Sequence, residues 1–310
     1  MDEMLRLTTP QVATFAARGF LRLDAVVPDE INQAFLADVG DVPEDQVDHI
    51  LAHYGRIMAS SAVPLVAPGT PLSEAYPARS ALARLFALPV VRGAIASLVG
   101  EAPVVDHHFL HFTLPPHLYE AAGQEHVSQF THQDSTIDPR RSFDIQIMYY
   151  PHEVTRAMGG TRYLPGSHLR IVSEAAIARY QNVLGQEHVV CPAGTLLLLH
   201  HGIWHGGGLN QSDRLRHMFK VRLCATEPQV RLWDTSDLEE EAPRPIFWQS
   251  APPEPGAVST ILTTREPWFE ADTERLEYIN RIRLWRYLTG DERFDADYWL
   301  TRLENEQGGS

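Results

Sequence analysis

His132 and Asp134 stand two residues apart in the stretch Phe-Thr-His-Gln-Asp-Ser at positions 130–135. In an extended segment, side chains two positions apart point to the same face, so the imidazole and the carboxylate are expected to lie side by side. A neutral imidazole and a carboxylate on one face are two of the three ligands of a facial iron site. The alternative is a polar surface strand, and a third ligand would distinguish the two.

The segment 198–210 offers three candidates for that third ligand: His200, His201 and His205. His205 is favoured by its relation to residues further along the chain. If the chain folds back as a hairpin centred on residues 210–211, His205 and Arg216 are directly opposed and share a face of the sheet. Arg214 lies two residues before Arg216 and would point to the same face of the strand, so it is the alternative to Arg216. The other two histidines would support or line the site.

A buried arginine beside a metal site is costly unless it meets an anion. 2-Oxoglutarate would provide one, because a guanidinium binds a carboxylate through two parallel hydrogen bonds and the keto-acid end can chelate the metal. Three protein ligands on one octahedral face leave two positions for the chelate and one for dioxygen. The glycines at 206–208 would let a ligand approach the backbone. These residues therefore predict Fe(II), with 2-oxoglutarate and O2 as cosubstrates.

The segments that must position these residues are of two kinds. A helix with Thr9 as N-cap is expected to run from Pro10 to about residue 18 and to stop at Gly19, followed by a strand at 20–27. Further helices are expected from Pro28, at 44–58 and at 78–99. Beyond residue 101, short extended segments separated by turn signals predict a β-sandwich or jelly roll: 104–113, 129–135, 143–150, 160–164, 188–191, 194–200 and 214–225. Residues 115–128 are expected to form a loop, and 171–183 a helical interruption.

Taken in order, the His-Gln-Asp motif, the segment 159–168 and His205 followed by Asn210, Ser212 and Arg216 resemble the phytanoyl-CoA hydroxylase family of Fe(II)/2-oxoglutarate dioxygenases. The resemblance covers roughly residues 8–225. It implies a double-stranded β-helix (a cupin-like jelly roll), iron held by His132, Asp134 and His205, and Arg216 binding the distal carboxylate of 2-oxoglutarate. The sequence departs from the family at Gly207, where members often carry a hydroxyl side chain, so one cosubstrate contact would be lost or replaced.

The remaining site residues are predicted from their places beside these motifs. Cosubstrate binding is expected from Arg216, Asn210, Ser212 and Gln146, and Gln146 shares a strand face with Met148. Substrate contacts are expected from residues flanking the ligands: Phe130, Gln133, Arg141 and Trp204. His168 is expected to sit in a turn, although it or His201 could assist at the site. Lys220, the only lysine of the chain, is expected to be an ordinary strand residue.

The expected domain organisation places one dioxygenase domain at 1–241, with helical support at 1–100 and a jelly-roll core at 101–225. Residues 242–310 would form a carboxyl-terminal extension, in which a proline-rich connection leads to helices, among them an amphipathic helix at 272–289. This extension would pack on the core or form a homodimer interface.

Composition narrows the range of partners. The chain has 310 residues, of which 44% are hydrophobic, and this is enough for a large core. Its net charge of −14 argues against nucleic acid or an anionic membrane as the partner. Two cysteines, no signal-like start and no long apolar run favour a reducing, cytoplasmic location without membrane spans. A small molecule is therefore the expected substrate.

The predicted activity is hydroxylation of an unactivated C–H bond, with formation of succinate and CO2. Desaturation, epoxidation or ring formation would use the same chemistry. A zinc or manganese hydrolase or isomerase on a cupin-like barrel is the alternative from another class, and it has no need for Arg216. A non-catalytic jelly-roll binding module is disfavoured by the intact ligand set.

Overall fold

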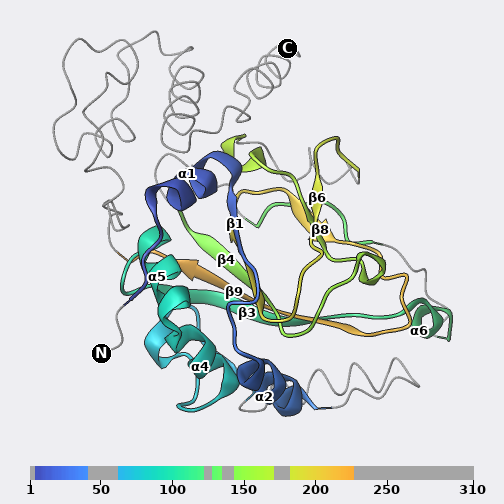
Figure 1. Cartoon of the computed structure of the whole chain (residues 1–310), viewed down its shortest axis with the longest axis horizontal. Helices are drawn as coiled ribbons and strands as arrows, with labels where there is room; N and C mark the ends of the chain where they lie inside the picture. Colours follow the sequence, from blue (N-terminus) through green and yellow to red (C-terminus); the bar gives the residue numbers. More distant parts are fainter. Residues whose placement is uncertain (1–3, 41–61, 122–127, 135–142, 171–181, 227–310) are drawn as a thin grey trace, which may run out of the picture.

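Two antiparallel sheets form the centre of the computed structural model, which describes residues 4–40, 62–121, 128–134, 143–170 and 182–226 (Figure 1). The larger sheet has the strand order β1-β7-β4-β9-β3-β2 and the smaller one β6-β5-β8. The strands are β1 Phe20–Leu23, β2 Thr70–Pro71, β3 Val104–Thr113, β4 Ile145–Tyr150, β5 Thr161–Tyr163, β6 Glu187–His188, β7 Thr195–His200, β8 His205–Gly207 and β9 Arg216–Cys224. The predicted mainly β, jelly-roll fold with flanking helices is confirmed.

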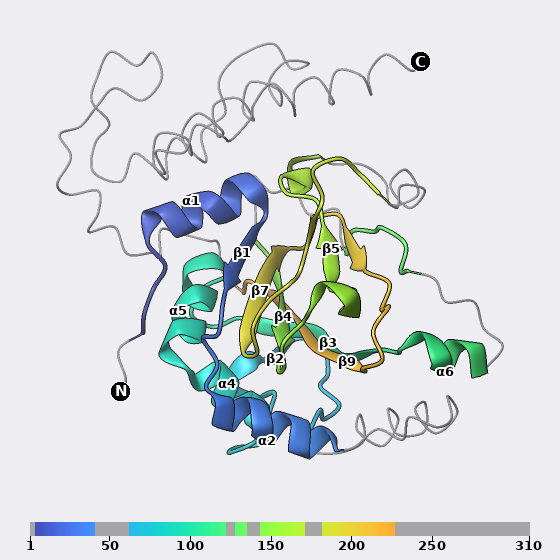
Figure 2. The ribbon, with the colours of Figure 1, turned by 45° about the vertical axis from the view of Figure 1, so that its right-hand side comes forward.

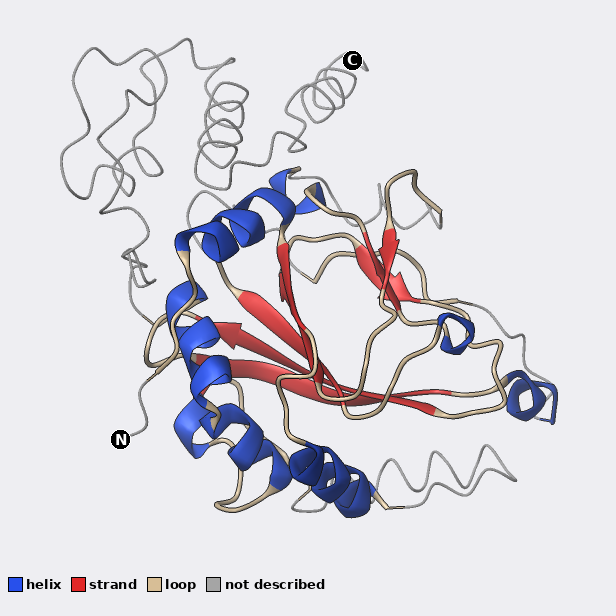
Figure 3. Ribbon diagram, viewed as in Figure 1, coloured by secondary structure: helices blue, strands red, loops and turns tan. Residues whose placement is uncertain are grey.

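Helices cover the outer face of the larger sheet. They are α1 Thr9–Arg18, α2 Asp29–Val39, α4 Ala81–Ala87 and α5 Pro89–Leu98, and they lie together along one side of that sheet (Figures 2 and 3). Their apolar side chains form one core with the outward-facing residues of the strands, such as Ile147, Leu198 and Val221. The amino-terminal helical portion thus supports the sheet that carries much of the site.

The inner face of the larger sheet packs against the smaller sheet. Because side chains alternate along a strand, the residues next to those in the helix-covered core point inward. Met148, Leu197 and Met218 belong to this second core, together with Tyr163 of the smaller sheet. Even-numbered residues of β4 and β9 therefore face the space between the two sheets, where a site can form.

Several element boundaries differ from the prediction. Thr8, rather than Thr9, caps α1, and it forms a capping box with Gln11. The helix expected at 78–99 is broken between α4 and α5, because the residue before Pro89 takes an extended conformation. The expected loop at 115–128 contains a helix, α6 Pro116–Ala121. The expected strand at 129–135 is reduced to one bridge at His132.

Other expectations lie outside the described residues: the helix at 44–58, most of the interruption at 171–183, and the whole extension 242–310 with its amphipathic helix and homodimer interface. Within the described ranges, no single helix is long and apolar enough to cross a membrane. Helices α4 and α5 would meet the length and composition only as a pair bent by 67°.

Gly19 ends α1 as predicted and also makes room for a side chain. Its φ of 76° is left-handed, and a Cβ built on it would lie 2.4 Å from Nδ1 of His168. The His168 ring is fixed there because its Nε2 donates to the carbonyl of Ala16 at 2.8 Å. His168 is therefore a packing residue between α1 and the ring of His200, whose centroid is 5.0 Å away, and the structure places it away from the predicted site.

Gly19→Ala is expected to lower the free energy of unfolding by the left-handed penalty of about 1–2 kcal/mol and by a further ~1–3 kcal/mol for the clash with His168. Gly69→Ala is the matched control, since Gly69 has a φ of 86° but nothing within 4 Å of its added Cβ. Urea unfolding of both variants, with a double-mutant cycle to His168→Ala, measures the clash separately. Equal losses at the two glycines would remove the proposed role of His168.

Candidate metal centre

A backbone bridge brings the segment 128–134 against β8. The N–H of His132 donates to the carbonyl of His205 at 2.9 Å, and the N–H of His205 donates back at 2.8 Å. The N–H of Asp134 donates to the carbonyl of His201 at 3.1 Å. Because directly bridged residues share a face, the two imidazoles lie side by side, with ring centroids 4.3 Å apart.

The three predicted ligands converge. One ligand atom from each of His132, Asp134 and His205 lies within 4.8 Å of the other two. Nε2 of His205 is 3.5 Å from Oδ2 of Asp134, and Nε2 of His132 is 3.9 Å from Oδ1.

Both imidazoles are oriented from behind by backbone carbonyls. Nδ1 of His132 donates to the carbonyl of Phe130 at 2.9 Å, and Nδ1 of His205 donates to that of Ile203 at 3.0 Å. These bonds fix the tautomer that leaves each Nε2 lone pair facing Asp134, which is the usual arrangement behind a metal-binding histidine.

Burial and neighbouring charges set the protonation of this group. Burial lowers the pKa of His205 to about 3, so its imidazole is neutral at neutral pH. Burial alone would raise the pKa of the Asp134 carboxyl, but His205, Lys220 and Arg222 together hold it below its usual range. Neutral imidazoles and an ionised carboxylate are the forms that bind a metal.

A pocket of about 370 Å³ opens on the two imidazoles. Its walls come from the inner faces of both sheets, from residues 128–130 and from the region of α6. Arg216, at the start of β9, is one of the lining residues and is 2% exposed. Its guanidinium donates to the carbonyl of Gly159 and, at 2.6 Å, to Oγ1 of Thr113. Its Nε has no partner among the described residues.

The hairpin that was expected to join His205 and Arg216 is wrong. β8 pairs with β5 in the smaller sheet, whereas β9 lies between β4 and β3 in the larger one. Arg216 is paired with Thr113. The two residues still line one pocket, because they reach it from facing sheets.

Asn210 and Ser212, which are predicted to bind the cosubstrate, are not among the residues that line the pocket. The amide nitrogen of Asn210 donates to the carbonyls of Thr113 and Arg214, and its oxygen accepts from both the N–H and the hydroxyl of Ser212. With its amide satisfied by these groups, Asn210 shapes the turn that leads into Arg216. Gln146 does reach the centre, since its Nε2 lies 3.3 Å from Nε2 of His205, and Met148 lines the pocket.

Of the four residues predicted to contact substrate, only Phe130 is among the described residues that line the pocket. Phe130 lines the pocket and is 67% exposed, whereas Gln133 is buried and absent from the lining. Trp204 packs on Leu164, with the guanidinium of Arg170 5.6 Å from its ring, and is not among the residues that line the pocket. Arg141 lies outside the described residues.

His201 is held away from the ligand set. Its Nε2 donates to the carbonyl of Ile145 at 2.8 Å, and Arg222 donates to its Nδ1 at 3.3 Å. Burial lowers its pKa to about 3. Its contribution is the backbone carbonyl that receives the N–H of Asp134.

Lys220 is the residue that sequence reasoning missed. Its Nζ lies 3.3 Å from Oδ2 and 3.5 Å from Oδ1 of Asp134, and its side chain is 8% exposed. It lines the same pocket as Arg216. The sequence could have indicated this, because residues 216 and 220 are four apart on one predicted strand and therefore face the same way.

The three glycines after His205 act differently from one another. A Cβ at Gly206 would lie 2.9 Å from the carbonyl of Phe130, and one at Gly208 would lie 2.7 Å from that of Gly160. These two positions let backbones pack closely. Gly207 lines the pocket, and a Cβ there would lie 4.0 Å from Nη2 of Arg216 and 3.4 Å from Gln129.

Gly207→Ser is therefore expected to fold normally and to add a hydroxyl beside Arg216. One new hydrogen bond contributes about 0.5–1.5 kcal/mol, so the affinity for 2-oxoglutarate should rise roughly two- to tenfold. Calorimetric titration of the metal-loaded protein measures this. Gly206→Ser is the contrast: its clash with backbone should lower the melting temperature. A folded Gly207→Ser variant with weaker 2-oxoglutarate binding would contradict the predicted role of Arg216 in cosubstrate binding.

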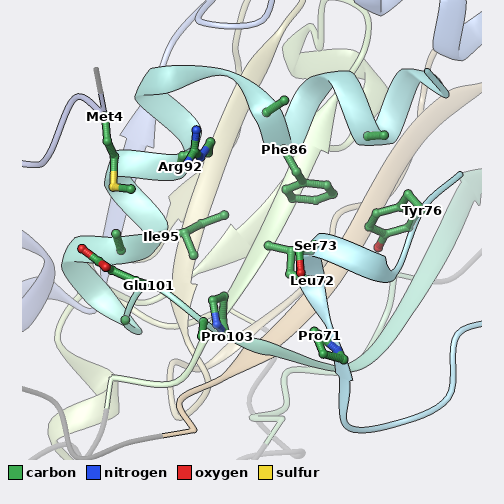
Figure 4. Close-up of a pocket in the computed structure, with 15 residues that line it drawn as sticks. Met4, Pro71, Leu72, Ser73, Tyr76, Phe86, Arg92, Ile95, Glu101 and Pro103 are labelled. Carbon is green, nitrogen blue, oxygen red and sulfur yellow. The ribbon is translucent and has the colours of Figure 1, made fainter. Parts of the chain in front are cut away.

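A second pocket, of about 430 Å³, lies among α4, α5, β2 and the 3₁₀ turn Leu72–Glu74 that follows β2 (Figure 4). Tyr76, Phe86 and Ile95 contribute apolar surface to it, and Arg92 and Glu101 contribute charge. None of the three candidate ligands lines it, so it is separate from the metal centre.

The chain is similar to known proteins in both sequence and fold. A family model described as phytanoyl-CoA dioxygenase (PhyH) matches residues 15–218. No protein of curated function matches the sequence significantly. Among solved structures, the apo non-heme monooxygenase ThoJ is 21% identical, with 69% of this chain and 78% of the ThoJ chain covered and a TM-score of 0.49.

Two further structures are similar to this chain. The α-ketoglutarate dependent carbocyclase SnoK from nogalamycin biosynthesis is 16% identical, with 76% and 91% of the two chains covered and a TM-score of 0.49. HygX from Streptomyces hygroscopicus, solved with nickel and 2-oxoglutarate, is 13% identical, with 75% and 94% covered and a TM-score of 0.45.

Proposed function

The chain belongs to the phytanoyl-CoA dioxygenase family of non-heme Fe(II)/2-oxoglutarate oxygenases, and from that membership we propose that it hydroxylates an unactivated C–H bond of a small molecule. The observation that carries the proposal is the convergence of His132, Asp134 and His205 at one end of a pocket that also contains Arg216. A cupin-like metal hydrolase has no need for a buried arginine in its pocket.

The residues present fit Fe(II). Two neutral imidazoles and one carboxylate are the donor set of a facial iron site, and both imidazoles are oriented by carbonyl groups behind them. Arg216 fits the cosubstrate, because it is buried, borders the pocket and contacts neutral oxygens in Gly159 and Thr113. A carboxylate would supply the negative charge that a buried guanidinium needs.

Each group then has a defined task. His132, Asp134 and His205 would hold the metal, and Arg216 would bind the distal carboxylate of 2-oxoglutarate through paired hydrogen bonds. Fe(II) with 2-oxoglutarate and dioxygen supplies the oxidising power for C–H cleavage. Met148 and Met218 line the inner wall and would keep water from the reacting groups. Phe130, exposed at the pocket, would meet the substrate.

The proposal is tested with the purified full chain. Under anaerobic conditions, adding Fe(II) and 2-oxoglutarate together is expected to give a visible charge-transfer band, and admitting air is expected to release succinate. Omitting either Fe(II) or dioxygen should prevent succinate formation. Metal binding without any 2-oxoglutarate binding would instead favour the hydrolase or isomerase alternative.

A further inference from the structure

The inner wall of the pocket carries two cations at its two ends. Arg216 and Lys220 lie four residues apart on β9 and face the same way, so their Cα atoms are about 13 Å apart. Opposite them on β3 stand Thr113 and Phe109. Arg216 contacts Thr113, and Nζ of Lys220 lies 5.9 Å from the centre of the Phe109 ring. The cations mark different ends of one wall.

Lys220 lies beside the proposed metal. Its ammonium contacts both oxygens of Asp134, at 3.3 and 3.5 Å. A metal bound to Asp134 would share the negative charge of the carboxylate with Lys220, so this carboxylate alone would no longer neutralise the ammonium. Nζ of Lys220 would then lie at the pocket beside the metal, able to bind a further anion.

The charges of the filled site leave room for one more anion. Among the described residues, Arg216, Lys220 and a divalent metal carry four positive charges, and Asp134 with the dianionic cosubstrate carries three negative ones. Arg222 does not change this balance, because it is paired with Asp106 at 3.4 Å. Arg216 and the metal already engage the two ends of 2-oxoglutarate in the proposed function. A buried charge without a partner is strongly unfavourable, so the remaining ligand of the pocket should supply the missing negative charge.

Resting on the proposed function, we propose that Lys220 binds a carboxylate of the substrate beside the metal. The substrate is then a small organic acid, and the oxidised carbon lies near its carboxylate. Phe130 lines the pocket and is 67% exposed, and Phe109, 41% exposed, lies beside Lys220, so both rings offer apolar surface to the rest of the molecule.

The single lysine makes a direct test possible. In the full chain labelled with ε-13C-lysine, Lys220 gives the one lysine ε-carbon resonance. Zn(II) and 2-oxoglutarate are added first, and the metal is expected to shift this resonance as it takes Asp134. Acetate, propionate and benzoate are then titrated, each against its amide. At least one acid should shift the resonance to saturation, and the amides should not. A resonance unmoved by all three acids, in protein that binds 2-oxoglutarate, overturns the inference.

Variants give a second readout by calorimetry with the same acids. Lys220→Met is expected to weaken acid binding about 30-fold or more, since removing one partner of a buried charge pair costs about 2 kcal/mol or more. Lys220→Arg should keep it within a few fold and guards against a folding defect in the methionine variant. Arg214→Met, at an exposed position outside the pocket lining, is the matched control.

The outcomes distinguish a failure of this inference from a failure of the proposed function. If Lys220→Met weakens 2-oxoglutarate binding instead, the lysine serves the cosubstrate and the present inference is overturned. If the unmodified protein binds Zn(II) but never 2-oxoglutarate, the proposed function falls and this inference falls with it.

Discussion

Asp134→Ala is expected to reduce Fe(II)-dependent succinate formation at least ~100-fold. The change removes the one anionic ligand and leaves two imidazoles, and changes to residues that only support a ligand already cost roughly 10- to 100-fold. It also leaves the ammonium of Lys220 buried without its counter-ion, which should destabilise the protein by about 3 kcal/mol. Calorimetric metal titration and thermal unfolding measure the two effects separately.

The double variant Asp134→Ala/Lys220→Met separates ligand loss from misfolding. Removing both charges should restore most of the lost stability while metal binding stays absent. Asp213→Ala, at an exposed position, should change neither quantity. Full metal affinity in the Asp134→Ala variant would exclude this carboxylate as a ligand.

Arg216→Met is expected to weaken 2-oxoglutarate binding by about 30-fold or more while leaving metal affinity intact. The reason is the loss of a buried, charge-assisted pair, which costs about 2–5 kcal/mol. The metal ligands lie on other segments, so the metal centre should persist. The measurement is a titration of metal-loaded protein with 2-oxoglutarate, followed by the KM for 2-oxoglutarate in the succinate assay.

Two further variants sharpen the assignment of Arg216. Arg216→Lys should recover only part of the affinity, because an ammonium cannot form the planar, two-pronged contact of a guanidinium. Arg214→Met removes a cation of equal charge outside the pocket lining and should have no effect. If Arg214→Met lost more 2-oxoglutarate affinity than Arg216→Met, Arg214 would be the residue that binds the cosubstrate.

Local rules account for the features that could be predicted. Alternation of side chains identified the shared face of His132 and Asp134, and the left-handed preference of glycine identified the end of α1 at Gly19. Such features depend on a few neighbouring residues, and the sequence contains all of them. The ordered set of ligand residues also carried the family resemblance.

Features that depend on distant packing were missed. The hairpin argument used only the spacing between His205 and Arg216, but the turn around Asn210 carries the chain from one sheet to the other. Lys220 pairs with a carboxylate 86 residues earlier in the chain, and no local pattern encodes that contact. The sequence likewise does not encode the hydrogen bonds that Asn210 makes to Thr113, 97 residues earlier in the chain, and to Arg214.

The bridge between His132 and His205 also protects the smaller sheet. β8 would be the edge strand of the order β6-β5-β8, and an open edge invites pairing with other chains. The segment 129–132 covers that edge, through His132 and through a bond from the N–H of Gln129 to the carbonyl of Gly207. The segment that carries His132 therefore also covers a sheet edge that could otherwise pair with another chain. A metal bound to His132 and His205 would hold this edge closed, and chelation would remove that restraint.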